Sequence, residues 1–114
     1  MNTIKIGQHG EQIAAAFLRS KNYKIHECNV RLGRDEIDII AYDCTERCLV
    51  FVEVKTRTMY DPEFPPEMAL NHHKKKKMKR AAWKWMYLHE YDAPWRMDAV
   101  LIIKSKVYRH IKYV

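Results

Sequence analysis

The sequence predicts an α/β sandwich in which helices flank a mixed central β-sheet. One observation is the order of the apolar patterns: a helical pattern, three strand-like segments, a long helical pattern, and two further strand-like segments. A second observation is that turn-forming residues separate these segments. Helices and strands in this order bury their apolar faces against one another around a shared sheet.

The first half of the chain supplies one helix and three strands. Residues 7–21 are expected to be helical, because four apolar residues recur at helical spacing: Ile13, Ala14, Phe17 and Leu18. This prediction places Glu11 in the first turn, where an acidic side chain complements the helix dipole. A turn is expected at residues 43–47. The three strands are expected over residues 23–31, 34–42 and 48–56.

The second half supplies a long helix and two closing strands. Residues 59–66 hold three of the four prolines and are expected to form a loop. One helix is expected over residues 67–90, with Lys74 lying on its apolar stripe. The other members of that stripe are Leu70, Met78, Ala81, Ala82, Trp85 and Leu88. The closing strands are expected over residues 97–103 and 107–114.

Composition narrows the class of protein. A length of 114 residues suits one domain, residues 1–114. No apolar run reaches the roughly 20 residues of a membrane span, and the first residues lack the apolar core of a secretory signal, so we expect a soluble cytoplasmic protein with no membrane partner. The odd count of three cysteines argues against a disulfide framework, and reduced thiols are favoured over a zinc site.

Two carboxylates are expected to meet across a hairpin. If Asp43 pairs with Cys48 around the predicted turn, Asp38 faces Glu53 on the neighbouring strand. Directly opposed residues have Cβ atoms about 5 Å apart, so the two acids repel unless a cation lies between them. Mg²⁺ and Mn²⁺ favour carboxylate oxygens. Lys55 lies two residues along the same strand face.

This set has the chemistry that phosphodiester hydrolysis needs. A metal held by Asp38 and Glu53 can supply hydroxide and polarise a phosphate, while Lys55 orients or deprotonates the attacking water. The alternative is a solvated strand face on which Glu53 and Lys55 form only weak cross-strand ion pairs. In that case Val50, Val52 and Val54 still form the core side of the strand.

The long helix carries the densest positive charge of a chain whose formal net charge is +7. Six of the seven residues from Lys74 to Arg80 are cations, which predicts contact with the phosphates of DNA, or of RNA. The nucleic-acid-binding residues expected are Arg31, Arg57, Lys74, Lys75, Lys76, Lys79 and Arg80. Trp83 and Trp95 suit base stacking, whereas Trp85 is expected in the core. Trp83 and Tyr87, which accompany the exposed cations, equally suit a homodimer surface.

The motifs together resemble a known family. Gly7–Glu11, the run Glu36-Ile37-Asp38-Ile39-Ile40 and the block Phe51-Val52-Glu53-Val54-Lys55 are similar to motifs of the YraN-like proteins, and to the PD-(D/E)xK nuclease superfamily. The resemblance implies a restriction-endonuclease-like three-layer sandwich, with a layout similar to Holliday-junction resolvases. Asp35 departs from the pattern, because glycine is usual there.

The resemblance also implies a role for each matching residue. Glu11 would be a carboxylate contributed by the first helix, Asp38 and Glu53 the metal ligands, and Lys55 the catalytic base or water-orienting group. The function expected first is therefore a metal-dependent DNA endonuclease, acting on branched or damaged DNA. The alternative is a non-catalytic nucleic-acid-binding module that keeps the nuclease fold and works with a repair or replication partner.

Overall fold

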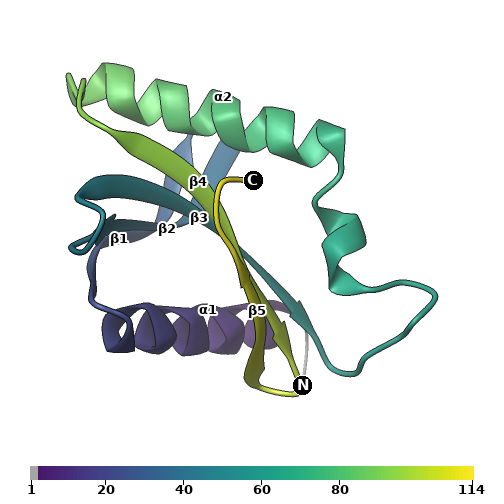
Figure 1. Cartoon of the computed structure of the whole chain (residues 1–114). Helices are drawn as coiled ribbons and strands as arrows, with labels where there is room; N and C mark the ends of the chain where they lie inside the picture. The colour runs from purple at the N-terminus through teal and green to yellow at the C-terminus, as the bar shows by residue number, and fades with distance from the viewer. Residues whose placement is uncertain (1–2) are drawn as a thin grey trace.

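A computed structural model describes residues 3–114 and contains one five-stranded sheet with strand order β1-β2-β3-β4-β5 (Figure 1). The elements in chain order are α1 (Thr3–Ser20), β1 (Tyr23–Leu32), β2 (Asp35–Asp43), β3 (Cys48–Arg57), the 3₁₀ helix η1 (Pro66–Ala69), α2 (His72–Leu88), β4 (Trp95–Ile103) and β5 (Lys106–Ile111). In the described part of the chain, no helix is long and apolar enough to cross a membrane.

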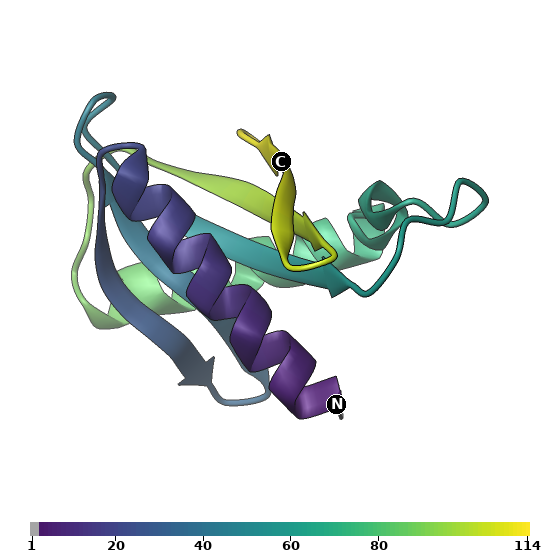
Figure 2. The ribbon, with the colours of Figure 1, turned by 90° about the horizontal axis from the view of Figure 1, so that it is seen from below.

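The sheet is mixed, as predicted. β1, β2 and β3 pair antiparallel, β3 pairs parallel with β4, and β4 pairs antiparallel with β5. A parallel pair needs a crossover, and η1 with α2 supplies it between β3 and β4. The predicted α/β three-layer sandwich is confirmed, because α1 and α2 lie on opposite faces of the sheet (Figures 1 and 2).

Both faces of the central strand β3 are buried, whereas the sequence analysis assigned only one face to the core. Val50 and Val52 pack under α1 in a cluster with Ala14 and Leu18. Phe51, on the other face, is 2% exposed and packs with the α2 residues of a second cluster. The prediction was wrong on this point because α2 covers the second face up to Phe51. Only beyond Phe51 does that face become partly exposed and polar, at Glu53 and Lys55.

Helix α1 begins earlier than predicted. It starts at Thr3 rather than Gly7, so its first turn contains no acidic residue. Glu11 therefore lies in the body of the helix, and the interpretation of its charge as a partner of the helix dipole is wrong. Glu11 lies next to Gly10, which is buried against β3.

The predicted helix over residues 67–90 is divided in two. Asn71 caps α2, because its side chain accepts a hydrogen bond from the Lys74 amide, and this cap separates α2 from η1. Leu70 is buried outside α2. The prediction for Leu88 was wrong, since that side chain is 65% exposed, and Met86 occupies the buried stripe instead.

Arg96 forms a buried cluster of charged side chains near the turn of the β2–β3 hairpin. Its side chain is 2% exposed and makes ion pairs with Asp43 at 2.9 Å and Asp98 at 2.9 Å. His110 lies 2.8 Å from the Asp98 carboxylate. Burial alone raises the pKa of Asp98, but hydrogen bonds from His110 and Arg96 hold it below its ordinary value. The cluster joins β2, β4 and β5.

Close contact between α1 and β3 depends on Gly10. A Cβ atom at this position would collide with the Thr56 hydroxyl oxygen and lie 3.2 Å from its Cβ. We expect Gly10→Ala to lower the free energy of unfolding by about 1–3 kcal/mol, through overpacking. Gly7→Ala is the matched control, because nothing lies within 4 Å of its added Cβ, and it should raise stability by about 0.5–1 kcal/mol. Urea denaturation checks both values; equal stability of the two variants would contradict the packing.

Candidate functional site

The β2–β3 hairpin has the predicted register. Asp43 pairs with Cys48, and Ile40 pairs with Phe51. The ladder ends at the pair formed by Ile39 and Val52, however, so the predicted pairing of Asp38 with Glu53 does not continue it. The Asp38 carboxylate accepts the backbone N–H of Val54 at 2.8 Å in place of a ladder bond.

Asp38 lies in a strongly negative, poorly solvated environment. Burial raises the pKa of Asp38 to about 7, and the negative charge of Glu53 adds to this effect. The hydrogen bond from Val54 and the positive charge of Lys74 oppose the increase. The charge of Glu53 therefore disfavours ionisation of Asp38, and a cation between the two side chains would remove that penalty.

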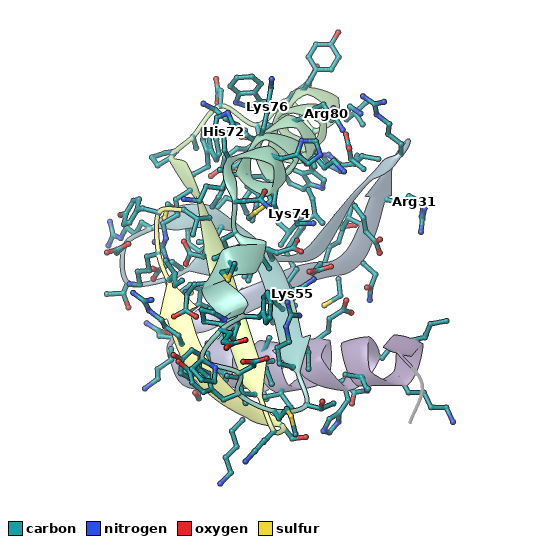
Figure 3. The ribbon with its side chains drawn as sticks, turned by 90° about the vertical axis from the view of Figure 1, so that its right-hand side faces the viewer. Arg31, Lys55, His72, Lys74, Lys76 and Arg80 are labelled. Carbon is teal, nitrogen blue, oxygen red and sulfur yellow. The ribbon has the colours of Figure 1, made fainter. Side chains whose placement is uncertain are left out.

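Lys74 contacts the second carboxylate directly. Its Nζ lies 3.0 Å from Oε1 of Glu53, whose side chain is 12% exposed. The inward orientation predicted for Lys74 is therefore confirmed, and Figure 3 shows this side chain pointing from α2 toward the sheet. The negative charge of the Glu53 carboxylate thus attracts the Lys74 ammonium.

Glu11 approaches the same group of carboxylates from α1. Burial raises its pKa, a hydrogen bond with the side chain of Asn29 opposes the increase, and the charges of Glu36 and Glu53 add to it. Glu11 therefore feels the field of the carboxylates on β2 and β3. Its electrostatic coupling to them agrees with a role beside the site.

Lys55 lies two residues beyond Glu53 on β3 and is half-buried. Among the described residues no hydrogen bond or ion pair is formed by its ammonium group, in contrast to Lys74. Glu36 lies 4.0 Å from Arg31 at the surface. Lys55 is therefore placed beside the site only by its position on β3, two residues beyond Glu53.

The carboxylates fit a hard divalent cation that retains other ligands. No group of three His, Cys, Asp or Glu side chains in residues 3–114 is arranged to hold a metal by itself, so neither the zinc alternative nor a closed metal cage is supported. Mg²⁺, however, is often bound by one or two carboxylates together with water and substrate phosphates. Asp38 and Glu53 are the pair of side chains that would hold such an ion, and Lys74 supplies the positive charge beside Glu53 in this structure.

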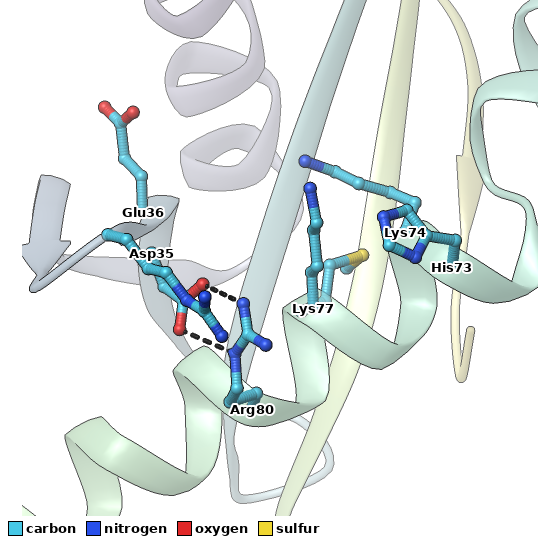
Figure 4. Close-up of a pocket in the computed structure, with 8 residues that line it drawn as sticks. Asp35, Glu36, His73, Lys74, Lys77 and Arg80 are labelled. Atoms are coloured by element: carbon cyan, nitrogen blue, oxygen red, sulfur yellow. Dashed lines mark hydrogen bonds and ion pairs between the residues drawn. The ribbon is translucent and has the colours of Figure 1, made fainter.

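A cavity of about 450 Å³ lies between the start of β2 and α2, and Lys74, one of its lining residues, contacts Glu53. The residues that line it include Arg34, Asp35, Glu36, Lys74, Lys77 and Arg80 (Figure 4). A much smaller cavity shares Glu36 and Met78 with it and reaches Glu53. The basic flank of α2 therefore faces the acidic end of β2 and β3.

Arg80 has a structural partner that the sequence analysis did not assign. Its guanidinium donates to both Asp35 carboxylate oxygens, at 2.9 and 2.6 Å (Figure 4). Lys84 contacts the same carboxylate at 2.7 Å. These two cations hold the pKa of Asp35 well below its ordinary value. Arg80 was expected on the exposed strip of α2, but the charge of Asp35 holds it at the rim of the cavity.

The remaining predicted nucleic-acid-binding residues are not gathered at one place. Lys75, Lys76 and Lys79 are exposed on α2. Arg31 is exposed on β1, whereas Arg57 ends β3 and lines a separate cavity with His9 and Lys104. Of the predicted set, Lys74 contacts Glu53 at 3.0 Å and Arg31 lies 4.0 Å from Glu36. Arg80 lines the cavity but is paired with Asp35.

Comparison with known proteins places the chain in a family. Residues 10–102 match the family described as "Uncharacterised protein family UPF0102". The chain belongs to the UPF0102 family. It is 40% identical to a UPF0102 protein of Pelobacter propionicus over 91% of this chain and 74% of that protein. It is 38% identical to one of Thermodesulfovibrio yellowstonii, over 98% of this chain and 96% of that protein. The predicted resemblance to YraN-like proteins is confirmed.

The UPF0102 match covers every carboxylate of the site: Glu11, Glu36, Asp38 and Glu53. Sequence reasoning missed two of the residues that position charges around them. Lys84 follows Arg80 by four residues, so both side chains lie on the same face of α2. This spacing would have predicted that both cations contact Asp35 only if the position of Asp35 opposite that face had been known. Asn29 has a left-handed backbone with φ of 53° and bonds Glu11, and no spacing in the sequence signals that contact.

The raised pKa of Asp38 predicts a pH-dependent stability. The folded protein binds this proton more tightly than the unfolded chain, so the stabilisation is full below about pH 4 and is lost as pH rises through about 7. In EDTA, we expect Asp38→Asn to gain stability relative to the parent by on the order of 2 kcal/mol between pH 5 and pH 8. Urea denaturation at both pH values measures the difference. Asp92→Asn, at an exposed acid, is the control, and a gain equal to that of Asp38→Asn would contradict the assignment.

Proposed function

We propose that this chain is a metal-dependent endonuclease that hydrolyses phosphodiester bonds of DNA. The observation that carries the proposal is the paired carboxylates at the end of the β2–β3 ladder, where the charge of Glu53 helps to raise the pKa of Asp38 to about 7. Perturbed carboxylates beside a cation-lined cavity are typical of functional sites. A purely structural role would not explain why two carboxylates that disfavour each other's negative charge are placed together.

The side chains divide the chemistry among them. Asp38 and Glu53 would hold Mg²⁺ or Mn²⁺, and the ion would supply Lewis acidity toward a phosphate oxygen and lower the pKa of water. Lys55 orients the attacking water and balances the charge that develops at phosphorus. Lys74 and Lys77, which line the cavity on the α2 side, bind the phosphates of the strand that is cut.

Besides binding phosphate, Lys74 has a second role, as the ion-pair partner of Glu53. In the absence of a metal its ammonium neutralises Glu53, at a distance of 3.0 Å. If Glu53 held a divalent ion, that ion and the Lys74 ammonium would repel each other, and Lys74 would turn to a phosphate in the cavity that it already lines. Lys74 would thus neutralise Glu53 in the metal-free protein and bind a phosphate in the metal-bound one.

A non-catalytic nucleic-acid-binding module is the second candidate. The ion pair between Lys74 and Glu53 favours it, because it satisfies Glu53 without any metal. The absence of a three-residue ligand group among residues 3–114 points the same way. In this case the cations of α2 bind DNA and no bond is broken.

One assay separates the two candidates. Branched, single-stranded and duplex DNA, and the corresponding RNA, are incubated with the protein in Mg²⁺, Mn²⁺ or EDTA, alongside Asp38→Asn. The proposal expects cleavage that requires the metal and is lost in Asp38→Asn. Cleavage that survives in EDTA or in Asp38→Asn would contradict the site. Salt-sensitive binding without cleavage on any substrate would support the second candidate instead.

A further inference from the structure

A second groove lies on the opposite flank of α2 from the carboxylate site. Its volume is about 610 Å³, and it runs between α2 and the C-terminal segment. The residues that line it include Lys75, Lys76, Lys79, Trp83, Met97 and Val114. The backbone N–H of Val114 donates to the carbonyl of Met97 at 2.9 Å, which holds the C-terminal segment against β4 as one wall.

The groove combines an apolar floor with a cationic rim. Met97 is only 9% exposed, whereas the indole of Trp83 is 55% exposed. The Lys79 ammonium lies 5.0 Å above the centre of the Trp83 ring. Figure 3 shows Lys76 on the outer side of α2, away from Lys74. None of the described residues that line the groove is acidic.

We infer that this groove binds a single-stranded segment of nucleic acid, with one base stacked on Trp83 and the neighbouring phosphates on Lys75, Lys76 and Lys79. Single-strand sites combine a positive groove with exposed aromatic rings in this way. The exposed indole suits an unpaired base, which presents its π-face, and the cations suit the backbone on either side. A base pair inside a duplex presents no such face.

A second copy of the chain is a poorer occupant. In a two-fold interface the same patch lies on both sides, so the lysines of one copy would face those of the other. No acidic side chain lines this groove to neutralise them in the described structure. Like charges at an interface disfavour association. A polyanion removes this repulsion, which is why the groove is assigned to nucleic acid.

The position of Arg80 connects the two sites. Arg80 lines both this groove and the cavity that Lys74 lines on the other flank of α2. A strand that leaves the cavity can therefore cross α2 over Arg80 and continue into the groove. This last step rests on the proposed function, and it specifies the substrate as DNA that carries a single-stranded flank beside the bond that is cut.

Binding is tested without cleavage. A fluorescein-labelled thymidine 12-mer and a blunt 12-base-pair duplex are titrated with the protein in EDTA, with fluorescence anisotropy as the readout. We expect Trp83→Ala to weaken binding of the 12-mer about 10-fold and to change duplex binding much less. Lys79→Ala should lower the salt dependence of 12-mer binding by about one phosphate contact.

Matched controls isolate the groove. Tyr87→Ala removes an exposed aromatic ring one turn further along α2, outside the groove, and should change binding less than 2-fold. Lys106→Ala removes an exposed cation on β5 and should preserve the salt dependence. Unchanged 12-mer affinity in Trp83→Ala, or an equal loss for the duplex, would overturn the inference. Light scattering that shows a dimer abolished by Trp83→Ala would overturn it in favour of a second copy.

Failure of the groove and failure of the proposed function are distinguishable. If Trp83→Ala weakens 12-mer binding but no substrate is cut in Mg²⁺ or Mn²⁺, the groove assignment stands and the endonuclease proposal fails. The opposite outcome has two parts: the parent and Trp83→Ala cut a duplex with a single-stranded flank and a blunt duplex equally well, and Trp83→Ala binds the 12-mer as tightly as the parent. In that case the endonuclease proposal stands and the groove assignment fails.

Discussion

Replacing Glu53 with Gln is expected to reduce metal-dependent DNA cleavage by at least about 100-fold, since even residues that only support a metal ligand cost about 10- to 100-fold when replaced. The substitution removes the charge that binds the cation but keeps the size of the side chain. It also removes the ion pair to Lys74. The initial rate of cleavage at saturating Mg²⁺ measures the effect.

Lys74→Met is the matched variant, because it breaks the same ion pair and leaves the carboxylate. It should bind Mn²⁺ more tightly than the parent, since Lys74 no longer competes for Glu53, and it should bind DNA more weakly. Equal loss of cleavage and of metal binding in the two variants would mean that the ion pair, rather than the carboxylate, is what matters. Retention of full cleavage by Glu53→Gln would contradict the assignment of Glu53.

Replacing Arg96 with Met is expected to lower the free energy of unfolding by about 3–5 kcal/mol, the cost of leaving a buried charge uncompensated. Arg96 is paired with both Asp43 and Asp98, and all three side chains are 2% exposed or less. The substitution leaves two buried carboxylates facing each other. Urea denaturation at pH 7 measures the loss.

Arg109→Met is the control for the buried pair. Arg109 bonds Glu67 at 3.1 Å, but its side chain is 56% exposed, so its removal should cost less than about 1 kcal/mol. Arg96→Lys keeps the charge without the forked geometry and should fall between the two. A loss below 1 kcal/mol in Arg96→Met would show that the cluster contributes no more than a surface pair.

The hairpin register was predictable because it depends on local information. The turn of residues 44–47 sets which residues of β2 and β3 face each other, and the pairing of Ile40 with Phe51 followed from it. The departure at Asp38 was not predictable in the same way. There a side chain, rather than a backbone group, accepts the Val54 N–H, and the alternation of residues along a strand carries no sign of that exchange.

Tertiary contacts account for the other differences. Asp35 and Arg80 are 45 residues apart, and only the packing of α2 over β2 brings them together. Asp98 is fully buried because Arg96, two residues away on β4, and His110, on the adjacent strand β5, compensate its charge there. Both carboxylates look solvent-exposed in the sequence, and the charges that compensate them become apparent only once the sheet and α2 have packed.

Paramagnetic broadening of backbone amide signals by Mn²⁺ tests the central claim most directly, namely that Asp38 and Glu53 hold a divalent cation at the end of the β2–β3 ladder. At substoichiometric Mn²⁺, we expect the signals of Asp38, Val54 and Lys55 to disappear first, and to remain in Glu53→Gln. Broadening centred elsewhere, or the same loss of these signals in Glu53→Gln, would contradict the claim.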